Sequence, residues 1–181
     1  MTWRVAILTC SDRCSRGETR DTGSPVLAAT VLKHLDAQIA HTACVPDDIP
    51  AIQAKLREWT AENQAVNLIL TTGGTGLSPR DNTPEATLPL LYKRAPGLLE
   101  LARLRCLTKT PKAFLSRGEA GLIHRTLVVN LPGSPRGAVE FFEAMADVLS
   151  HALAIACGDV NDHSQCTEPE QGQKNTSGFA G

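Results

Sequence analysis

The sequence predicts an α/β domain in which a mainly parallel sheet is covered by helices on both faces. Short, uninterrupted apolar runs, as at residues 4–10, are typical of strands that are buried on both sides. Helical patterns follow these runs, and this alternation implies right-handed crossovers between parallel strands. With 181 residues, 42% of them hydrophobic, the chain is long enough for one domain with a sizeable core.

The elements can be placed by their patterns and by the residues that begin helices. Thr83 is predicted to cap a helix, with Pro84 at its first position and Glu85 beside the positive end of its dipole. Asp48 and Ser134 are expected to cap two other helices. Strands are predicted at 4–10, 39–45, 66–71 and 126–131, and helices at 25–36, 49–62, 85–92, 98–107 and 135–157.

The domain is expected to comprise residues 1–158. Residues 159–181 are polar and almost free of aliphatic side chains, which predicts a flexible C-terminal tail. No internal repeat precedes it. The sequence therefore predicts one catalytic or binding domain followed by a tail.

Charge and composition argue against several classes of partner. A net charge of −1 gives no general attraction to nucleic acid or acidic membranes, and 4% aromatic residues disfavour a base-stacking surface. No apolar run is long enough to span a bilayer, and the N-terminus lacks the pattern of a secretion signal. We therefore expect a cytoplasmic protein that binds neither nucleic acid nor membrane.

The cysteines are scattered and form no CxxC pair, so they are expected to be reduced thiols. A catalytic or metal-binding role for Cys14, beside Arg13 and Arg16, is the alternative, although no obvious base lies nearby in the sequence. The full set is Cys10, Cys14, Cys44, Cys106, Cys157 and Cys166.

A glycine-rich loop follows the apolar run 68–70 and reads TTGGTG. It matches neither the Walker A pattern nor the dinucleotide fingerprint at a helix start. Glycines at 73, 74 and 76 allow positive φ and let a ligand approach backbone N–H groups. Two interpretations remain from these six residues alone, a tight turn or a site for a phosphate or a ring.

Two aspartates follow neighbouring predicted strands, because Asp47 comes after the second strand and Asp81 lies on the loop after the third. The carboxyl ends of parallel strands meet at one edge of a sheet, so these loops should converge with the loop at Ser11. Two carboxylates there would suit Mg²⁺, which leaves other positions to water and substrate phosphates. The alternative is helix capping, in which Asp48 is the better cap and Asp47 the better ligand candidate.

Three further loops offer hydroxyl groups, guanidinium groups and backbone donors, at 11–13, 116–118 and 132–135. Each could simply turn the chain. Arg13, Arg80 and Arg117 could equally be solvated surface charges or could bind an anionic ligand beside the glycine loop.

Taken together, five segments of the chain resemble the molybdopterin-binding family, over about residues 3–158. The segments, in the order of the family, are SDR at 11–13, PDD at 46–48, TTGGTGLSPRDNTPEAT at 71–87, LSRG at 115–118 and NLPGSP at 130–135. The resemblance implies a homotrimeric three-layer αβα sandwich of molybdenum cofactor biosynthesis. It further implies transfer of AMP from Mg²⁺–ATP to the terminal phosphate of molybdopterin, with release of pyrophosphate. The molybdate-inserting enzyme of the pathway is the partner that the resemblance suggests.

The resemblance also assigns roles to residues. Asp47 and Asp81 would hold Mg²⁺ and support catalysis. The pocket for molybdopterin and ATP would be lined by Ser11, Asp12, Thr72, Gly73, Gly74, Thr75, Gly76, Ser116, Arg117, Gly133 and Ser134. Nucleotidyl transfer needs alignment and charge neutralisation rather than a protein nucleophile, which agrees with the absence of a Ser-His-Asp or Cys-His pattern.

Two other functions are compatible with the same segments, namely a binding protein with altered catalysis and an oligomeric scaffold. Asp47 and Asp81 favour the enzyme, and the lack of an appended domain or long linker in this sequence disfavours the scaffold. Asn82 departs from the family, which has a branched apolar residue there, and the tail is longer than the resemblance covers.

Overall fold

The computed structural model describes residues 2–158, and the predicted tail at 159–181 lies outside the described residues. The strands are β1 (Trp3–Cys10), β2 (Ala37–Val45), β3 (Leu68–Thr72), β4 (Lys93–Arg94), β5 (Ala120–Ile123) and β6 (Thr126–Leu131). The α-helices are α1 (Asp12–Ser15), α2 (Gly23–His34), α3 (Ile49–Trp59), α4 (Thr83–Thr87), α5 (Pro96–Cys106) and α6 (Pro135–Cys157). Short 3₁₀ helices are η1 (Glu62–Gln64), η2 (Leu88–Leu90) and η3 (Pro111–Leu115).

The strands form one six-stranded sheet in the order β2-β1-β3-β6-β5-β4. The pairs β1–β2, β1–β3 and β3–β6 are parallel, whereas β5 pairs antiparallel with β6 and β4 antiparallel with β5. The predicted mainly parallel sheet is therefore confirmed. The antiparallel edge formed by β4 and β5 was not predicted.

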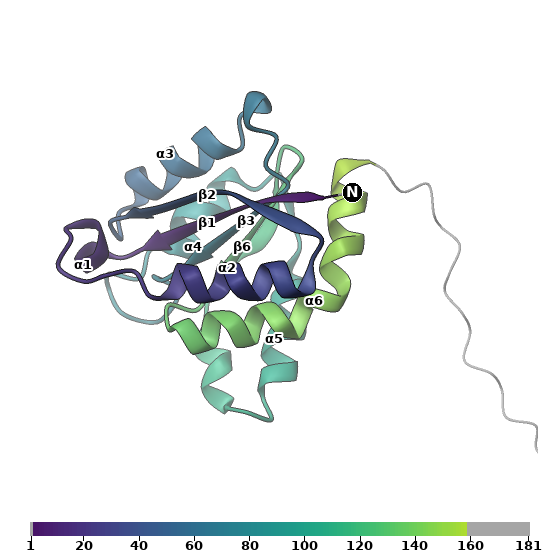
Figure 1. The fold of residues 1–181 in the computed structure, drawn as a ribbon. Helices are drawn as coiled ribbons and strands as arrows, with labels where there is room; N and C mark the ends of the chain where they lie inside the picture. The colour runs from purple at the N-terminus through teal and green to yellow at the C-terminus, as the bar shows by residue number, and fades with distance from the viewer. Residues whose placement is uncertain (1, 159–181) are drawn as a thin grey trace, which may run out of the picture.

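Helices cover both faces of the sheet, as predicted. Helices α2, α5 and α6 lie against one face and α3 against the other (Figure 1). Alternate residues of a strand serve the two faces: Leu68 and Leu70 of β3 belong to the core under α2 and α6, and Ile69 to the core under α3. This is the three-layer αβα sandwich.

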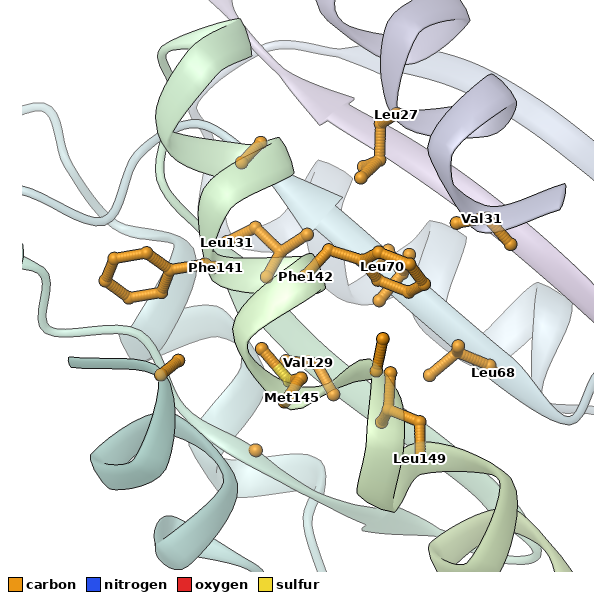
Figure 2. Close-up of a cluster of buried hydrophobic side chains, with 14 of the residues drawn as sticks. Leu27, Val31, Leu68, Leu70, Val129, Leu131, Phe141, Phe142, Met145 and Leu149 are labelled. Atoms are coloured by element: carbon orange, nitrogen blue, oxygen red, sulfur yellow. The ribbon is translucent and has the colours of Figure 1, made fainter. Parts of the chain in front are cut away.

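Helix α6 forms the centre of the larger core. Its Phe142, fully buried, points toward Leu70 of β3, and Met145 and Leu149 continue the same stripe along the helix (Figure 2). The neighbouring Phe141 points to another side of α6 and is also buried. The apolar stripe that predicted this helix therefore is the surface that anchors it to the sheet.

The helix starts partly agree with the predictions. Asp48 Oδ2 accepts from Ala51 N–H, and Ser134 Oγ accepts from Gly137 N–H, so both predicted caps are confirmed. The prediction for Thr83 is wrong, because Asn82 occupies the cap position of α4 and makes no side-chain cap bond, while Thr83 lies inside the helix.

Helix α4 is shorter than the predicted helix at 85–92. It ends at Thr87 and continues as the 3₁₀ turn η2, which contains Pro89. Proline has no N–H to donate back to the residue four positions earlier, so the α-helical pattern cannot pass through it unchanged.

Two other findings concern partners and redox state. No helix among residues 2–158 is both long and apolar enough to cross a membrane.

Within that range all five cysteines are free thiols, as predicted, and Cys166 lies outside the described residues. Burial raises the pKa of Cys10 to about 12, which keeps that thiol protonated and unreactive.

Candidate functional site

The predicted site residues lie at the edge of the sheet where the parallel strands end, close to α1 in Figure 1. The loops after β1 and β2 are joined by a reciprocal pair of bonds: Asp12 N–H donates to Asp47 Oδ2 at 3.1 Å, and Asp47 N–H donates to Asp12 Oδ1 at 3.1 Å. The ends of β3 and β6 are joined by Thr72 Oγ1, which donates to the Pro132 carbonyl at 2.9 Å. The prediction that these loops converge is confirmed.

The glycine loop packs backbone against backbone at Gly73. This residue has a φ of +104°, and a β-carbon there would lie 2.1 Å from the carbonyl oxygen of Cys10 at the end of β1. A β-carbon at Gly133, in the loop after β6, would lie 3.1 Å from Gly73 Cα. The glycines are therefore required for three loops to approach one another this closely.

The next two glycines lie against the two predicted catalytic aspartates. A β-carbon at Gly74 would be 3.0 Å from Asp47 Oδ1, and one at Gly76 would be 2.8 Å from Asp81 Oδ2. Asp81 does not cap α4, because its Oδ2 instead accepts from Ser78 N–H at 2.9 Å within the loop. The structure thus places both carboxylates beside one short stretch of backbone.

Asp47 differs from Asp81 because its oxygen without a hydrogen-bond partner is buried. Its Oδ1 is buried and has no hydrogen-bond partner among residues 2–158, while Oδ2 accepts only from Asp12 N–H. Burial, and after it the negative charges of Asp12 and Asp81, raises the pKa of Asp47 above its usual range. A buried carboxylate beside two others is stabilised by a cation, and oxygen donors are those that Mg²⁺ prefers.

Asp12 differs from Asp47 in its charge balance. A hydrogen bond from the guanidinium group of Arg80 is the main reason that the pKa of Asp12 lies below its usual range. No group of three or more His, Cys, Asp or Glu side chains with metal-site geometry occurs in the described part of the chain. Asp47 and Asp81 can supply one or two carboxylates, the number that Mg²⁺ commonly takes from a protein when water and phosphate oxygens fill its other positions.

Two cavities flank the glycine loop. The larger, of about 690 Å³, is lined by seven of the predicted site residues: Gly74, Thr75, Gly76, Asp81, Ser116, Gly133 and Ser134. The smaller, of about 250 Å³, is lined by Ser11, Thr72, Gly73 and again Gly133. Asp12, Asp47 and Arg117 line neither. Gly133 lines both cavities, so the two lie side by side at the glycine loop.

A still larger cavity, of about 1080 Å³, lies at the opposite edge of the sheet, beside the amino ends of β3 and β6. It is lined by residues such as Asn67, Tyr92 and Arg125, and by none of the predicted site residues. The two cavities at the carboxyl edge are the better site candidates because ligands of parallel α/β sheets bind at that edge.

Backbone donors are available in the glycine loop. The N–H groups of Gly74, Thr75 and Gly76 donate to no other residue within 2–158, and all three residues line the larger cavity. Free N–H groups beside a cavity can bind phosphate oxygens without a side chain.

Arg117 organises this loop. Its Nε donates to the Gly76 carbonyl at 2.7 Å, its Nη2 to the Asp81 carbonyl at 2.7 Å, and its Nη1 pairs with the Glu85 carboxylate. Its own N–H donates to the Thr75 carbonyl at 2.8 Å. The guanidinium group is thus bonded to protein atoms on both sides of Asp81, which makes Arg117 a positioning residue for the Asp81 loop.

Sequence reasoning missed three cationic side chains that line the larger cavity: Lys109, Lys112 and Arg136. Lys109 lies in the turn between α5 and η3, and Lys112 lies in η3 itself. Arg136 lies in the first turn of α6, directly after the predicted GSP segment. These cations lie close in sequence to the segments 115–118 and 132–135, and that closeness could have assigned them to the site.

The fold and this edge define an α/β protein with a glycine loop, two aspartates and adjacent cavities suited to a phosphate-bearing ligand. Comparison with known proteins makes the class more specific. A family model described as a probable molybdopterin binding domain matches residues 6–151, and the chain belongs to that family. The resemblance found in the five sequence segments is therefore confirmed.

Individual relatives agree with this family membership. Molybdopterin adenylyltransferase of Helicobacter pylori strain J99 is 34% identical over 175 residues, which cover 94% of this chain and 99% of that protein. Molybdenum cofactor synthesis protein cinnamon of Drosophila melanogaster is 39% identical over 155 residues, or 86% of this chain. The chain spans 26% of the length of cinnamon.

A solved structure shows the same fold. The crystal structure of the molybdopterin biosynthesis enzyme MoaB of Thermus thermophilus superposes with a TM-score of 0.81 at 49% sequence identity. The match covers 87% of this chain and 98% of that one. The predicted three-layer fold is confirmed by this likeness as well as by the layers described above.

The close approach at Gly73 predicts a large effect of a single methyl group. Gly73→Ala should lower the free energy of unfolding by at least about 2 kcal/mol, because alanine is strained at positive φ and would collide with the Cys10 carbonyl. Gly97→Ala is the matched control, since a β-carbon there meets no atom within 4 Å. Urea unfolding measures both. Equal stability of the two variants would contradict the role given to Gly73.

The bonds of Arg117 predict a local effect on the Asp81 loop. Arg117→Lys keeps the charge but loses the planar fork, so hydrogen exchange at the amides of Ser78, Asp81 and Thr83 should accelerate by about tenfold. Arg57→Lys, on helix α3, is the control. Unchanged exchange at all three amides in Arg117→Lys would show that another contact holds the loop.

Proposed function

We propose that this protein is a molybdopterin adenylyltransferase, which transfers AMP from Mg²⁺–ATP to the terminal phosphate of molybdopterin and releases pyrophosphate. The observation that carries the proposal is the placement of Asp47 and Asp81 against two glycines of one loop, beside two adjacent cavities. The family and the name of the Helicobacter pylori relative support the same reaction.

In the proposed reaction a terminal phosphate oxygen of molybdopterin attacks the α-phosphorus of ATP. The bond between that phosphorus and the bridging oxygen to the β-phosphate breaks, and pyrophosphate leaves with the electron pair. Both reacting groups belong to substrates, so the protein needs no nucleophile of its own. Its task is to align two anions that repel each other.

Several groups of this chain can perform that alignment. The free N–H groups of Gly74, Thr75 and Gly76 can donate to phosphate oxygens at the larger cavity. Ser116 Oγ lies 3.4 Å from Thr75 Oγ1, so the 115–118 loop adds hydroxyl groups beside the same backbone. These donors are fixed by the fold before the substrates arrive, which lowers the cost of ordering them in the transition state.

Asp47 and Asp81 would hold the Mg²⁺ ion, because Asp47 Oδ1 has no partner among residues 2–158 and both carboxylates face the glycine loop. The bound ion would neutralise negative charge on the phosphates of ATP as pyrophosphate departs. Arg117 keeps Asp81 in place through the carbonyl groups of Gly76 and of Asp81 itself.

The proposal extends to assembly and to the next step of the pathway. We propose a homotrimer, located in the cytoplasm, that passes adenylated molybdopterin to a molybdate-inserting enzyme. Both statements rest on what the resemblance of the five sequence segments implies. The mass of the protein in solution tests the first statement.

Adenylyl transfer can be measured directly. Purified protein incubated with ATP, Mg²⁺ and molybdopterin should form adenylated molybdopterin. Asp81→Asn and Asp47→Asn should lower turnover by about 100-fold or more and leave molybdopterin binding within a few-fold of wild type, because each removes a carboxylate that would hold the Mg²⁺ ion beside the reacting phosphates.

Asp48→Asn is the matched control, since asparagine also caps a helix and Asp48 bonds to the start of α3. Wild-type turnover in Asp47→Asn or Asp81→Asn would remove that aspartate from the mechanism. Binding of molybdopterin without product formation by the wild type would favour a catalytically altered relative.

The raised pKa of Asp47 predicts how metal binding depends on pH. Only the ionised carboxylate attracts Mg²⁺, and burial raises the pKa of Asp47, so this group loses its charge at a higher pH than a free aspartate. Mg²⁺ affinity, measured by calorimetry without nucleotide, should therefore weaken as the pH falls, beginning above the usual aspartate range. Asp47→Asn should lack this component. An identical pH profile in the variant would assign the dependence to another group.

A further inference from the structure

Three arginines near the glycine loop are bonded to protein atoms, which limits what they can offer a ligand. Arg80 pairs with Asp12. Arg117 bonds two carbonyl groups and Glu85. Arg103 donates to the Ser116 carbonyl at 3.1 and 2.9 Å and to the Gly118 carbonyl at 3.2 Å. These three guanidinium groups hold loops together, so an anionic ligand in the larger cavity depends on other cations.

Three other cations line the 690 Å³ cavity, and Arg20 lines the smaller cavity beside it. Lys109 and Lys112 come from the turn between α5 and η3 and from η3 itself, and Arg136 comes from the start of α6. Lys112 forms no ion pair with any residue in 2–158, and its side chain is exposed. The same cavity is lined by the glycine loop at 74–76, so the three cations and the free backbone donors face one space.

Glu140 is the acidic residue that pairs with two of these cations. Its carboxylate lies 3.0 Å from Arg136 Nε and 3.9 Å from Lys109 Nζ, and its side chain is 15% exposed. A carboxylate that shares two cations in the absence of ligand competes with any anion that enters. Glu140→Gln keeps the shape of this largely buried side chain and removes its charge, so it should free both cations.

We propose that Lys109, Lys112 and Arg136 form the site for the polyphosphate chain of the nucleotide, with Glu140 as its internal competitor. The identity of the nucleotide rests on the proposed function, whereas the anion site rests on the cavity. Three cations match a chain of several phosphates better than a single phosphate monoester. Lysines on long flexible stems can follow such a chain, and their exposure makes the attraction dependent on salt.

Binding of inorganic pyrophosphate to the full chain tests the site without catalysis. Calorimetry at low and high salt should show that Lys109→Ala/Lys112→Ala weakens binding by about tenfold and flattens the salt dependence. Glu140→Gln should tighten binding by about threefold, an outcome that general loss of structure cannot produce. Lys33→Ala, which removes one positive charge in the last turn of α2, should leave the affinity unchanged.

Specific results would overturn the proposal. One is an unchanged pyrophosphate affinity in the double variant, with its thermal stability equal to wild type. Another is weaker or equal binding in Glu140→Gln. If inorganic phosphate binds as tightly as pyrophosphate and loses as much affinity in the double variant, the site is one for a phosphate monoester and the polyphosphate assignment is wrong.

The test also separates this inference from the proposed function. If the pyrophosphate results are as expected and the wild type forms no adenylated molybdopterin, the anion site stands and the reaction is wrong. If the wild type forms the product and the double variant keeps its affinity for both pyrophosphate and ATP, the reaction stands and this site is wrong.

Discussion

The arrangement of the site depends on backbone contacts that leave no room for a β-carbon at Gly73 and little at Gly133. Gly73 at positive φ touches the end of β1, and Gly133 after β6 touches Gly73. These contacts draw together the ends of three strands that are neighbours in the sheet. Because the loop is held at this point, its next residues run beside Asp47 and Asp81, which arrive from different strands. The position of the carboxylates is thus a consequence of the glycines.

Much of the fold could be predicted because its elements carry their signals locally. The buried runs of β1, β3 and β6 and the stripe of α6 need no knowledge of the rest of the chain. The short edge strands are different. β4 is two residues long, and it is a strand because Lys93 and Arg94 pair with Leu122 and Gly121. Such pairing depends on tertiary structure and produces no alternation of apolar and polar residues in the sequence.

In the site, too, some features could be predicted from the sequence and others depend on tertiary structure. The sequence predicted that the carboxylates would meet at the edge of the sheet, because parallel topology alone brings the loops there. The sequence could not show whether Arg117 contacts a ligand or positions the Asp81 loop. That depends on which carbonyl groups surround its guanidinium group in the fold. Lys109 and Lys112 were overlooked for a related reason: a basic turn becomes part of a site only when the fold places it across a cavity.

The two kinds of cation suit two kinds of task. A guanidinium group has several donors in one plane, so Arg117 can bond two carbonyl groups and a carboxylate at once and hold them in a fixed relation. An ammonium group is a point charge on a flexible stem and can adjust to a ligand that enters and leaves. In the proposed complex the aspartates with their metal ion and the lysines both contact the 690 Å³ cavity through Asp81, Lys109 and Lys112. With the metal ion beside Asp81 and the positive charges at the lysines, the nucleotide would be oriented in the cavity. The departing phosphates would be stabilised by the lysines, while the aspartates hold the metal ion.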